Sequence, residues 1–188
     1  MASEGEAIGS AAARLAGDSM AGVWRLDPGR SSVRFRVKHF WGLITVRGSF
    51  TKFEGSATID RAGTISGSMR IDATSVETGH SKRDQHLRTA DFFDADNHPT
   101  ISFSTRQVSP RGDQHVAVDG ELTAAGRTRP ISFDARVTEV DAAAGRVTVD
   151  AEITLDRTEF EMTWSPLRMA SSTVVVSIDG ELVRAQAS

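Results

Sequence analysis

Residues that could do chemistry gather in the segment 75–100, SVETGHSKRDQHLRTADFFDADNHPT, which holds three of the five histidines of the chain. In this segment His80 and His86 flank the carboxylate of Asp84. Imidazoles and carboxylates together can transfer protons or bind a metal ion. One hypothesis is therefore a hydrolase-like or metal-assisted enzyme that acts on a small apolar substrate through His80, Asp84 and His86.

The spacing of these residues favours a structural role instead. Histidines that bind a metal from one helix are usually four residues apart. His80 and His86 are six residues apart, which separates them by about 120° around a helix. We expect Arg83 and Asp84 to be paired or hydrogen-bonded partners that dock the segment on the rest of the fold. The predicted docking set is His80, Arg83, Asp84, His86, Leu87, Arg88, Phe92 and Phe93, with no catalytic residue and no metal site.

The rest of the sequence offers no further catalytic motif. The chain has no cysteine, which excludes disulfides, thiolate zinc sites and cysteine nucleophiles. It contains no GxSxG, P-loop or GxGxxG sequence. The net charge of −3 comes from interspersed acids and bases, so we expect no nucleic-acid partner. No apolar run is long enough to span a membrane as a helix.

The segment 80–93 is predicted to be one short helix inserted among strands. It has few β-branched residues, and Leu87, Ala90 and Asp91 fall three and four residues apart. Ser81 is the expected N-cap, with Asp84 three residues later in a capping-box arrangement. Pro99 then ends the connection to the next strand.

Outside this segment the sequence alternates with a period of two, which indicates half-buried β-strands. In the stretch 32–38, SVRFRVK, apolar residues face one side and Arg34, Arg36 and Lys38 face water. The other strand-like stretches are 44–50, 69–71, 101–103, 116–118, 131–137 and 147–155, with a valine-rich run over 173–183.

Short turn signals separate these stretches, such as Asp27-Pro28-Gly29, Ala125-Gly126 and Ala144-Gly145. Connections this short join antiparallel neighbours, because parallel strands need long crossovers. We expect about eight strands closed into an antiparallel barrel, since closure removes the exposed sheet edges. Phe160, Met162 and Trp164 are expected to share one strand face. The predicted interior residues are Val33, Phe35, Val37, Phe50, Met69, Ile71, Phe103, Phe133, Leu155, Phe160, Met162 and Trp164.

The domain organisation follows from where the alternation begins. Residues 1–22 are rich in small residues and are predicted to be a mobile extension, followed by one barrel domain over 23–188. The start carries Glu4 and Glu6 where a secretory signal would carry basic residues. We therefore expect a cytoplasmic protein. A homodimer is compatible with the sequence.

The chain resembles the YceI-like, or polyisoprenoid-binding, family from Trp24 to about Val183. The resemblance rests on five stretches of the sequence. They are W-x-L-D-x-x-x-S-x-V-x-F-x-V-x-H from Trp24, V-x-G-x-F-x-x-F-x-G from Val46, S-V-x-T-x-H-x-x-R-D-x-H-L-R-x-x-D-F-F from Ser75, H-P-x-I-x-F from His98, and G-x-L-T-x-x-G-x-T-x-P from Gly120.

The resemblance implies an all-β, lipocalin-like, eight-stranded antiparallel barrel. In that fold the pore holds a long apolar chain, such as a polyprenyl or quinone tail or a related amphiphile. Many relatives begin with a secretory signal and work in the periplasm, which this start does not match. The implied function is a non-enzymatic lipid carrier with no cofactor other than a bound polyprenyl or quinone-type lipid, and a long-chain apolar small molecule as its partner.

Physical reasoning about the pore adds two expectations. An eight-stranded barrel is wide enough for its own side chains or for one slender ligand. Because no predicted interior strand position carries a charge, we expect the polar head at the mouth and an affinity that changes little with the head group. A barrel filled by its own core, as in an interaction protein, remains the third hypothesis beside the carrier and the enzyme.

Overall fold

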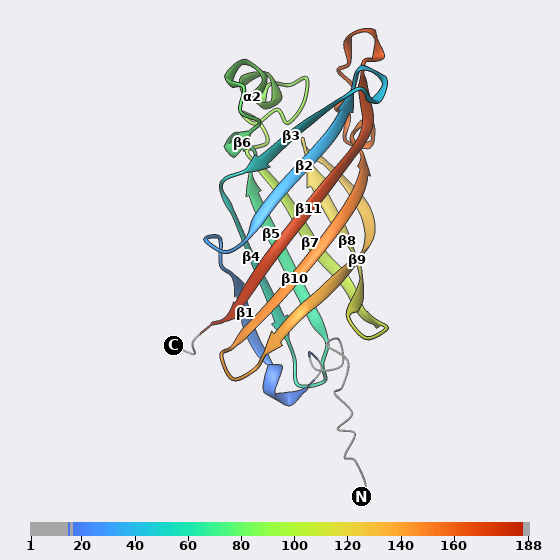
Figure 1. Cartoon of the computed structure of the whole chain (residues 1–188). Helices are drawn as coiled ribbons and strands as arrows, with labels where there is room; N and C mark the ends of the chain where they lie inside the picture. Colours follow the sequence, from blue (N-terminus) through green and yellow to red (C-terminus); the bar gives the residue numbers. More distant parts are fainter. Residues whose placement is uncertain (1–14, 16, 186–188) are drawn as a thin grey trace, which may run out of the picture.

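The strands close into one antiparallel barrel (Figure 1). The computed structural model describes residues 15 and 17–185, apart from the side chains of Asp18, Trp41 and Arg168. Within them, eight strands form a ring that the β1–β11 pairing closes. They are β1 (Gly22–Leu26), β4 (Phe53–Ile59), β5 (Ile65–Asp72), β7 (Thr100–Arg111), β8 (His115–Ala124), β9 (Arg127–Asp141), β10 (Arg146–Asp156) and β11 (Ala170–Arg184). The predicted all-β fold and the eight-stranded antiparallel barrel are thus confirmed.

Three more strands extend the wall at the end that lies uppermost in Figure 1. They are β2 (Ser32–His39), β3 (Ile44–Phe50) and β6 (Val76–Glu77). The long strand β11 pairs with β1 near its C-terminal end and with β2 over the rest of its length. As a result β1 and β2 follow each other along β11, and β3 and β6 continue the sheet beyond β2.

The strands have the register that the alternation predicts. Val33, Phe35 and Val37 point into the barrel, whereas Arg34 and Arg36 are exposed on its outside. The guanidinium of Arg36 forms an ion pair with Glu152 of β10 at 3.0 Å. A shift of one residue would reverse every one of these positions, so the two-residue period fixes which face is inside.

Packed apolar side chains fill the lower end of the barrel. Trp24 and Met20 are each 1% exposed, and the indole nitrogen of Trp24 donates to the Met20 carbonyl at 2.9 Å. Leu15 is buried in the same cluster, with Val137 of β9. Leu15 and Met20, the last residue of the 3-10 helix Asp18–Met20, therefore belong to the core, although we expected them in the mobile extension. Residues 1–14 lie outside the described residues.

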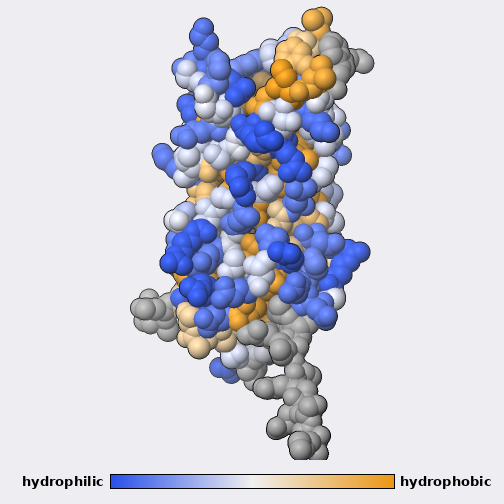
Figure 2. Space-filling model, viewed as in Figure 1, coloured by the Kyte–Doolittle hydropathy of each residue, from blue (hydrophilic) through white to orange (hydrophobic). Residues whose placement is uncertain are grey.

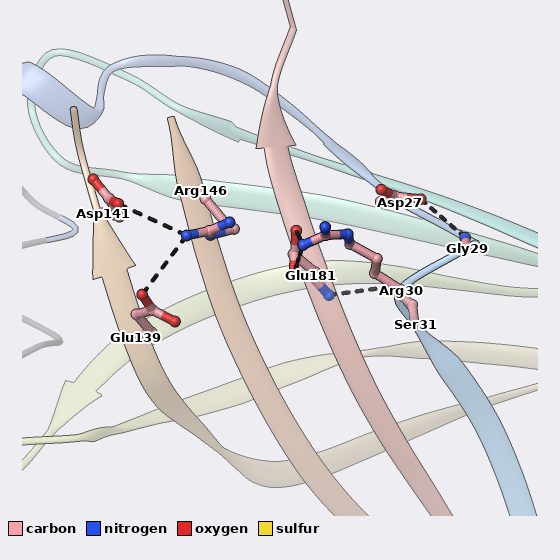
Figure 3. A network of polar contacts seen from close by, with 8 residues as sticks. All are labelled: Asp27, Gly29, Arg30, Ser31, Glu139, Asp141, Arg146 and Glu181. Atoms are coloured by element: carbon pink, nitrogen blue, oxygen red, sulfur yellow. Dashed lines mark hydrogen bonds and ion pairs between the residues drawn. The ribbon is translucent and has the colours of Figure 1, made fainter. Parts of the chain in front are cut away.

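Ion pairs cover the outside of this lower half (Figure 3). Arg30 binds Glu181 at 3.2 Å, and the side chain of Arg146 lies between Glu139 and Asp141, at 4.0 and 3.8 Å. Exposed pairs of this kind each stabilise a protein by less than about 1 kcal/mol. The barrel is therefore stabilised mainly by the hydrogen bonds between its strands and by its apolar core.

The helix α2 (Ser81–Arg88) lies between β6 and β7, as the sequence predicts, at the upper end of the barrel (Figure 1). Its N-cap is His80, not the expected Ser81, and no side chain caps it. Asp84 accepts hydrogen bonds from Thr78 instead of forming a capping box. None of the described helices is long and apolar enough to cross a membrane.

The segment after β10 also differs from the expectation. Phe160 ends the 3-10 helix Arg157–Phe160, and Met162 and Trp164 follow in a loop, so the three share no strand. The loop turns because Glu161 has a left-handed backbone with φ of 62°. A second 3-10 helix, Pro166–Arg168, leads into β11. The remaining 3-10 helices are Phe40–Gly42 between β2 and β3, and Ala73–Ser75 between β5 and β6.

Candidate functional site

A cavity of about 260 Å³ occupies the upper half of the barrel. All twelve residues that the sequence predicts to be interior line it, including the three on the loop after β10. Phe160 and Met162 are almost fully buried there, whereas Trp164 is 40% exposed at the rim. The barrel therefore has a filled lower half and a hollow upper half.

The cavity wall includes further residues that the prediction missed. Most are apolar positions in the same alternation, and four come from the valine-rich strand β11. They are Val46, Ile101, Leu122, Ala124, Ile131, Ile153, Ala170, Val174, Val176 and Ile178. Ile153 lies two residues before Leu155, and Ile131 lies two residues before Phe133. Residues so spaced face the same side of a strand, so the alternation could have predicted several of these positions.

Two glycines give aromatic side chains room inside the barrel. A Cβ atom on Gly48 would lie 2.4 Å from the ring of Phe35, its cross-strand partner. A Cβ atom on Gly120 would lie 2.5 Å from the ring of Phe103 and 2.4 Å from the Ser104 carbonyl oxygen. Both rings thus lie flat over glycine backbone, which leaves open space beside them.

The segment around α2 closes one side of the cavity. Leu87, Phe92 and Phe93 line it, and the ring of Phe93 packs edge-on against Phe50 of β3, with centroids 5.6 Å apart. The His86 ring packs edge-on against Trp164 at 4.4 Å. This contact joins the helix to the loop after β10 across the opening of the cavity.

The polar groups of the cavity wall are all basic. The only lining residues among the described ones that are not apolar are His39, Arg83, His86 and Arg157. No strand position in the cavity wall bears a charged arginine, as we expected, but Arg83 on α2 and Arg157 on the 3-10 helix after β10 bring charge to the cavity from outside the strands. His39 ends β2, in the same alternation as Val37, and Arg157 directly follows β10, two residues after Leu155. The alternation continued to the strand ends and could have placed both residues inside.

Arg157 is a buried cation without an acidic partner. Its side chain is 6% exposed and donates hydrogen bonds to the carbonyl oxygens of Met162, Trp164 and Ser171 at 2.5–3.0 Å. Burial lowers the pKa of its guanidinium, yet an arginine stays charged in a protein. Among the described residues it forms no ion pair within 4.0 Å, but the more distant carboxylate of Asp156 partly offsets the effect of burial on its pKa, and its guanidinium lies over the ring of Phe92, 5.8 Å from the centroid.

Arg83 and Asp84 meet at Thr78, and no direct ion pair between them is formed. The carboxylate of Asp84 accepts from the backbone N–H of Thr78 at 2.9 Å and from its hydroxyl at 2.5 Å. The guanidinium of Arg83 donates to the same hydroxyl at 2.7 Å and to the Thr78 carbonyl at 3.0 Å. The two side chains thus attach α2 to Thr78, the residue that directly follows β6.

The cations raise the local potential enough to affect His39. Partial burial lowers the pKa of the His39 imidazole, and the nearby charges of Arg157 and Arg83 lower it further. The imidazole is therefore held neutral by an environment that disfavours another positive charge. The positive potential of Arg157 and Arg83 would favour an anion at this place, whereas the desolvation, which is the larger cause, disfavours a charge of either sign.

The residues of the enzyme hypothesis have separate partners. His80 is exposed and caps α2, Asp84 binds Thr78, and His86 binds Asp91 at 2.7 Å. Within the part of the chain that the structure describes, no group of three or more His, Asp or Glu side chains could hold a metal ion. Of the docking set, Arg83, His86, Leu87, Phe92 and Phe93 line the cavity, and His80, Asp84 and Arg88 do not.

Comparison with known sequences places this barrel among related proteins. A family model described as the YceI-like domain matches residues 24–182. A UPF0312 protein of Pectobacterium carotovorum is 32% identical over 176 residues, which cover 90% of each chain. A UPF0312 protein of Vibrio cholerae is 36% identical over 107 residues, and the match spans 56% of each chain.

Solved structures share the fold. BcnA of Burkholderia cenocepacia has a TM-score of 0.75 at 22% identity, covering 83% of this chain and 98% of its own. A polyisoprenoid binding domain from Saccharophagus degradans, described as implicated in plant cell wall breakdown, has a TM-score of 0.71 at 19% identity. The two matches cover 83% and 86% of this chain, so the likeness extends over the whole barrel.

Proposed function

The chain belongs to the YceI-like domain family, and on that premise we propose that it is a non-enzymatic carrier of a long-chain isoprenoid, quinone-tail or similar amphiphilic lipid. The observation that supports this most is the apolar cavity, whose wall is hydrocarbon except for four basic groups at one end. A related fold is described as a polyisoprenoid binding domain, which agrees with a ligand of this class.

The energetics of such a site favour a slender apolar tail. Each buried methylene contributes about 0.8 kcal/mol. A tail with about ten buried carbons therefore gains about 8 kcal/mol, the free energy of micromolar binding before association costs. Side chains such as Phe35, Met69 and Phe133 offer only contact area, so the tail is selected by its width and length.

The head group belongs at the basic end of the cavity. Arg83 and Arg157 point their charges there without an acidic partner among the described side chains. A head with negative charge or strong hydrogen-bond acceptors would complement them, since charge-assisted hydrogen bonds are the stronger ones. This reverses the expectation that affinity is indifferent to the head group.

A two-way ligand series tests the proposal. Prenyl alcohols of increasing length, titrated by displacement of a fluorescent probe, should bind more tightly until the cavity is full. Prenyl carboxylates of the same lengths should bind more tightly than the alcohols. An affinity that is flat across the lengths would contradict the carrier function, whereas equal affinities of acid and alcohol would contradict only the role of the basic end.

A further inference from the structure

Exposed apolar side chains concentrate on one rim of the barrel. Of the seven large hydrophobic residues that are exposed among the described ones, four lie on two loops, and a fifth, Ile44, begins the strand that follows one of them. Leu43 and Leu167 are the most exposed, at 85% and 83%. We call these five residues the apolar rim: Phe40 and Leu43 between β2 and β3, Ile44 at the start of β3, and Trp164 and Leu167 before β11.

The two loops are held side by side although they lie more than a hundred residues apart in the sequence. The backbone N–H of Phe40 donates to the carbonyl of Met169 at 2.7 Å, and His39 pairs with Ala170. Figure 1 shows both loops projecting together from the top of the barrel, and Figure 2 shows apolar surface gathered over the same corner. The rim is therefore one continuous projection and not two separate loops.

The backbone of both loops is arranged so that the apolar side chains face outward. Phe40 has a φ of 50° and Leu167 a φ of 54°, in the left-handed region that such residues rarely adopt. Conformations of this kind cost about 1–3 kcal/mol each, and they persist where function requires them. If this rim faced only water, burial of Leu43 and Leu167 would lower the free energy of the folded protein.

The apolar rim is continuous with the mouth of the cavity. Trp164 belongs to both, because its ring lines the cavity and is also 40% exposed. His39 lines the cavity and is followed directly by Phe40 of the rim. A molecule that enters or leaves the cavity at this end passes beside the rim.

Two cations lie on the strands that lead into and out of the loop between β2 and β3. Lys38 and Arg47 are exposed on the outer face of β2 and β3, and neither forms an ion pair with a described residue. The Lys38 side chain lies close to Gly42 of the loop. On the other loop, Glu161 is bound to Arg127 and Glu159 is exposed. An apolar tip beside free cations complements a bilayer surface with anionic head groups.

We propose that the apolar rim docks on a lipid bilayer that carries anionic head groups and inserts Leu43, Leu167 and their neighbours into the interface. A bilayer fits better than a second copy of the chain, because a twofold contact would bring Lys38 and Arg47 against the same cations of the partner. Trp164 sits where an interfacial tryptophan is favoured, with one edge apolar and one wet. Docking there would place the cavity mouth against the membrane.

Vesicle flotation of the full chain tests this. Wild type should float with vesicles of phosphatidylcholine that contain phosphatidylglycerol, and binding should weaken as salt rises. Leu43→Asp with Leu167→Asp should reduce the bound fraction at least about tenfold, because the interface excludes charge from the inserted face. Lys38→Glu with Arg47→Glu should reduce binding to the anionic vesicles and leave the weak binding to pure phosphatidylcholine vesicles unchanged.

The matched control is Val23→Asp with Val183→Asp, which places the same two charges on exposed valines of β1 and β11 at the other end of the barrel. It should bind vesicles as wild type does. The proposal is overturned if wild type does not float, if the Leu43/Leu167 variant floats equally well, or if sedimentation shows a dimer that this variant dissociates. Circular dichroism melts show whether each variant folds. If the Leu43/Leu167 variant does not fold, the flotation of the Lys38→Glu with Arg47→Glu variant tests the proposal.

The docking does not depend on which ligand the cavity holds. The Leu43/Leu167 variant keeps the whole cavity wall, so its affinity for prenyl ligands in solution should equal that of wild type. If this variant loses vesicle binding and keeps ligand binding, the result supports membrane docking by the apolar rim independently of the carrier function. Normal flotation with no ligand binding would leave the rim standing and contradict the carrier function.

Discussion

At the scale of single residues, Arg157 distinguishes this cavity from a purely apolar one. Its guanidinium is held by three carbonyl oxygens from the loop that follows it and from the start of β11. Burial disfavours this charge, and Asp156, the nearest carboxylate that acts on it, forms no ion pair with it within 4.0 Å. The cost is offset if an anionic head completes its coordination.

The first prediction concerns the substitution Arg157→Gln. We expect it to reduce the affinity for a prenyl carboxylate by about 1.5–3 kcal/mol, the value of a hydrogen bond to a charged group, and to change that for the matching alcohol much less. Arg157→Lys keeps the charge and should lose less. Isothermal titration of both ligands measures the two differences, and a parallel loss for acid and alcohol would show that Arg157 only supports the fold.

The second prediction concerns pH and His39. Its pKa is lowered in the folded state by burial and by Arg157 and Arg83. The unfolded chain therefore binds a proton first as the pH falls through about 6.5, and folding stability decreases below that pH. Denaturant titrations at pH 7.5 and pH 5 should show a smaller decrease for His39→Gln than for wild type. An equal decrease in both proteins would rule out His39 as the cause.

The third prediction concerns Asp84 and the shared threonine. Asp84→Ala removes the acceptor of the Thr78 N–H and hydroxyl, which are partly buried. We expect a loss of about 1–3 kcal/mol in the free energy of unfolding. Gln85→Ala, at an exposed position on the same helix, should change it by less than about 0.5 kcal/mol. If both variants melt alike, the Thr78 contacts do not hold α2.

At the scale of secondary-structure elements, the barrel depends on how its strands approach one another. The ring of Phe103 on β7 lies over the backbone of Gly120 on the neighbouring strand β8, where a side chain would collide with it. This contact makes the glycine a sensitive position.

The fourth prediction is therefore that Gly120→Ala destabilises the protein. The new methyl group would meet a backbone oxygen at 2.4 Å, which cannot turn away as a flexible side chain could. We expect a cost of about 1–3 kcal/mol, as for overpacking in a core, and a lower melting temperature. Gly55→Ala in β4, where a Cβ would have its nearest neighbours at 3.4 Å and φ is not positive, is the matched control and should cost less. If the Gly55 variant loses as much stability, the clash at Gly120 does not explain its effect.

At the scale of the whole molecule, the barrel has two functionally different ends. Met20 and Trp24 help to fill the lower half with buried side chains. The upper half is hollow, basic at one end and apolar elsewhere, and its rim projects beyond the strands. A lipid tail of the kind that we propose would enter from the hollow end.

The fifth prediction tests that division. Met69 lines the cavity from β5, opposite Phe103, so Met69→Trp should fill it and abolish the binding of long prenyl chains. Ser68→Trp adds the same side chain to the outer face of the same strand and should bind as wild type. Thermal melts check that both variants fold. Unchanged long-chain binding by the Met69 variant would show that the tail does not lie in this cavity.

The sequence determined the barrel and most of its interior, because strand alternation is a local property that tertiary contacts do not have to supply. Val33, Phe35 and Val37 were placed inside by their exposed neighbours alone. The short turns fixed the antiparallel order, and the polar segment around His86 was recognised as an insertion.

Only the tertiary structure decided what the ends of the barrel look like. The meeting of Arg83 and Asp84 at Thr78 depends on how a helix settles against a strand, and the coordination of Arg157 depends on a loop that folds back over it. The apolar rim joins loops that are distant in sequence. Strand ends and loops follow no repeating pattern, so long-range pairing sets their positions, and it is there that the basic end and the rim arise.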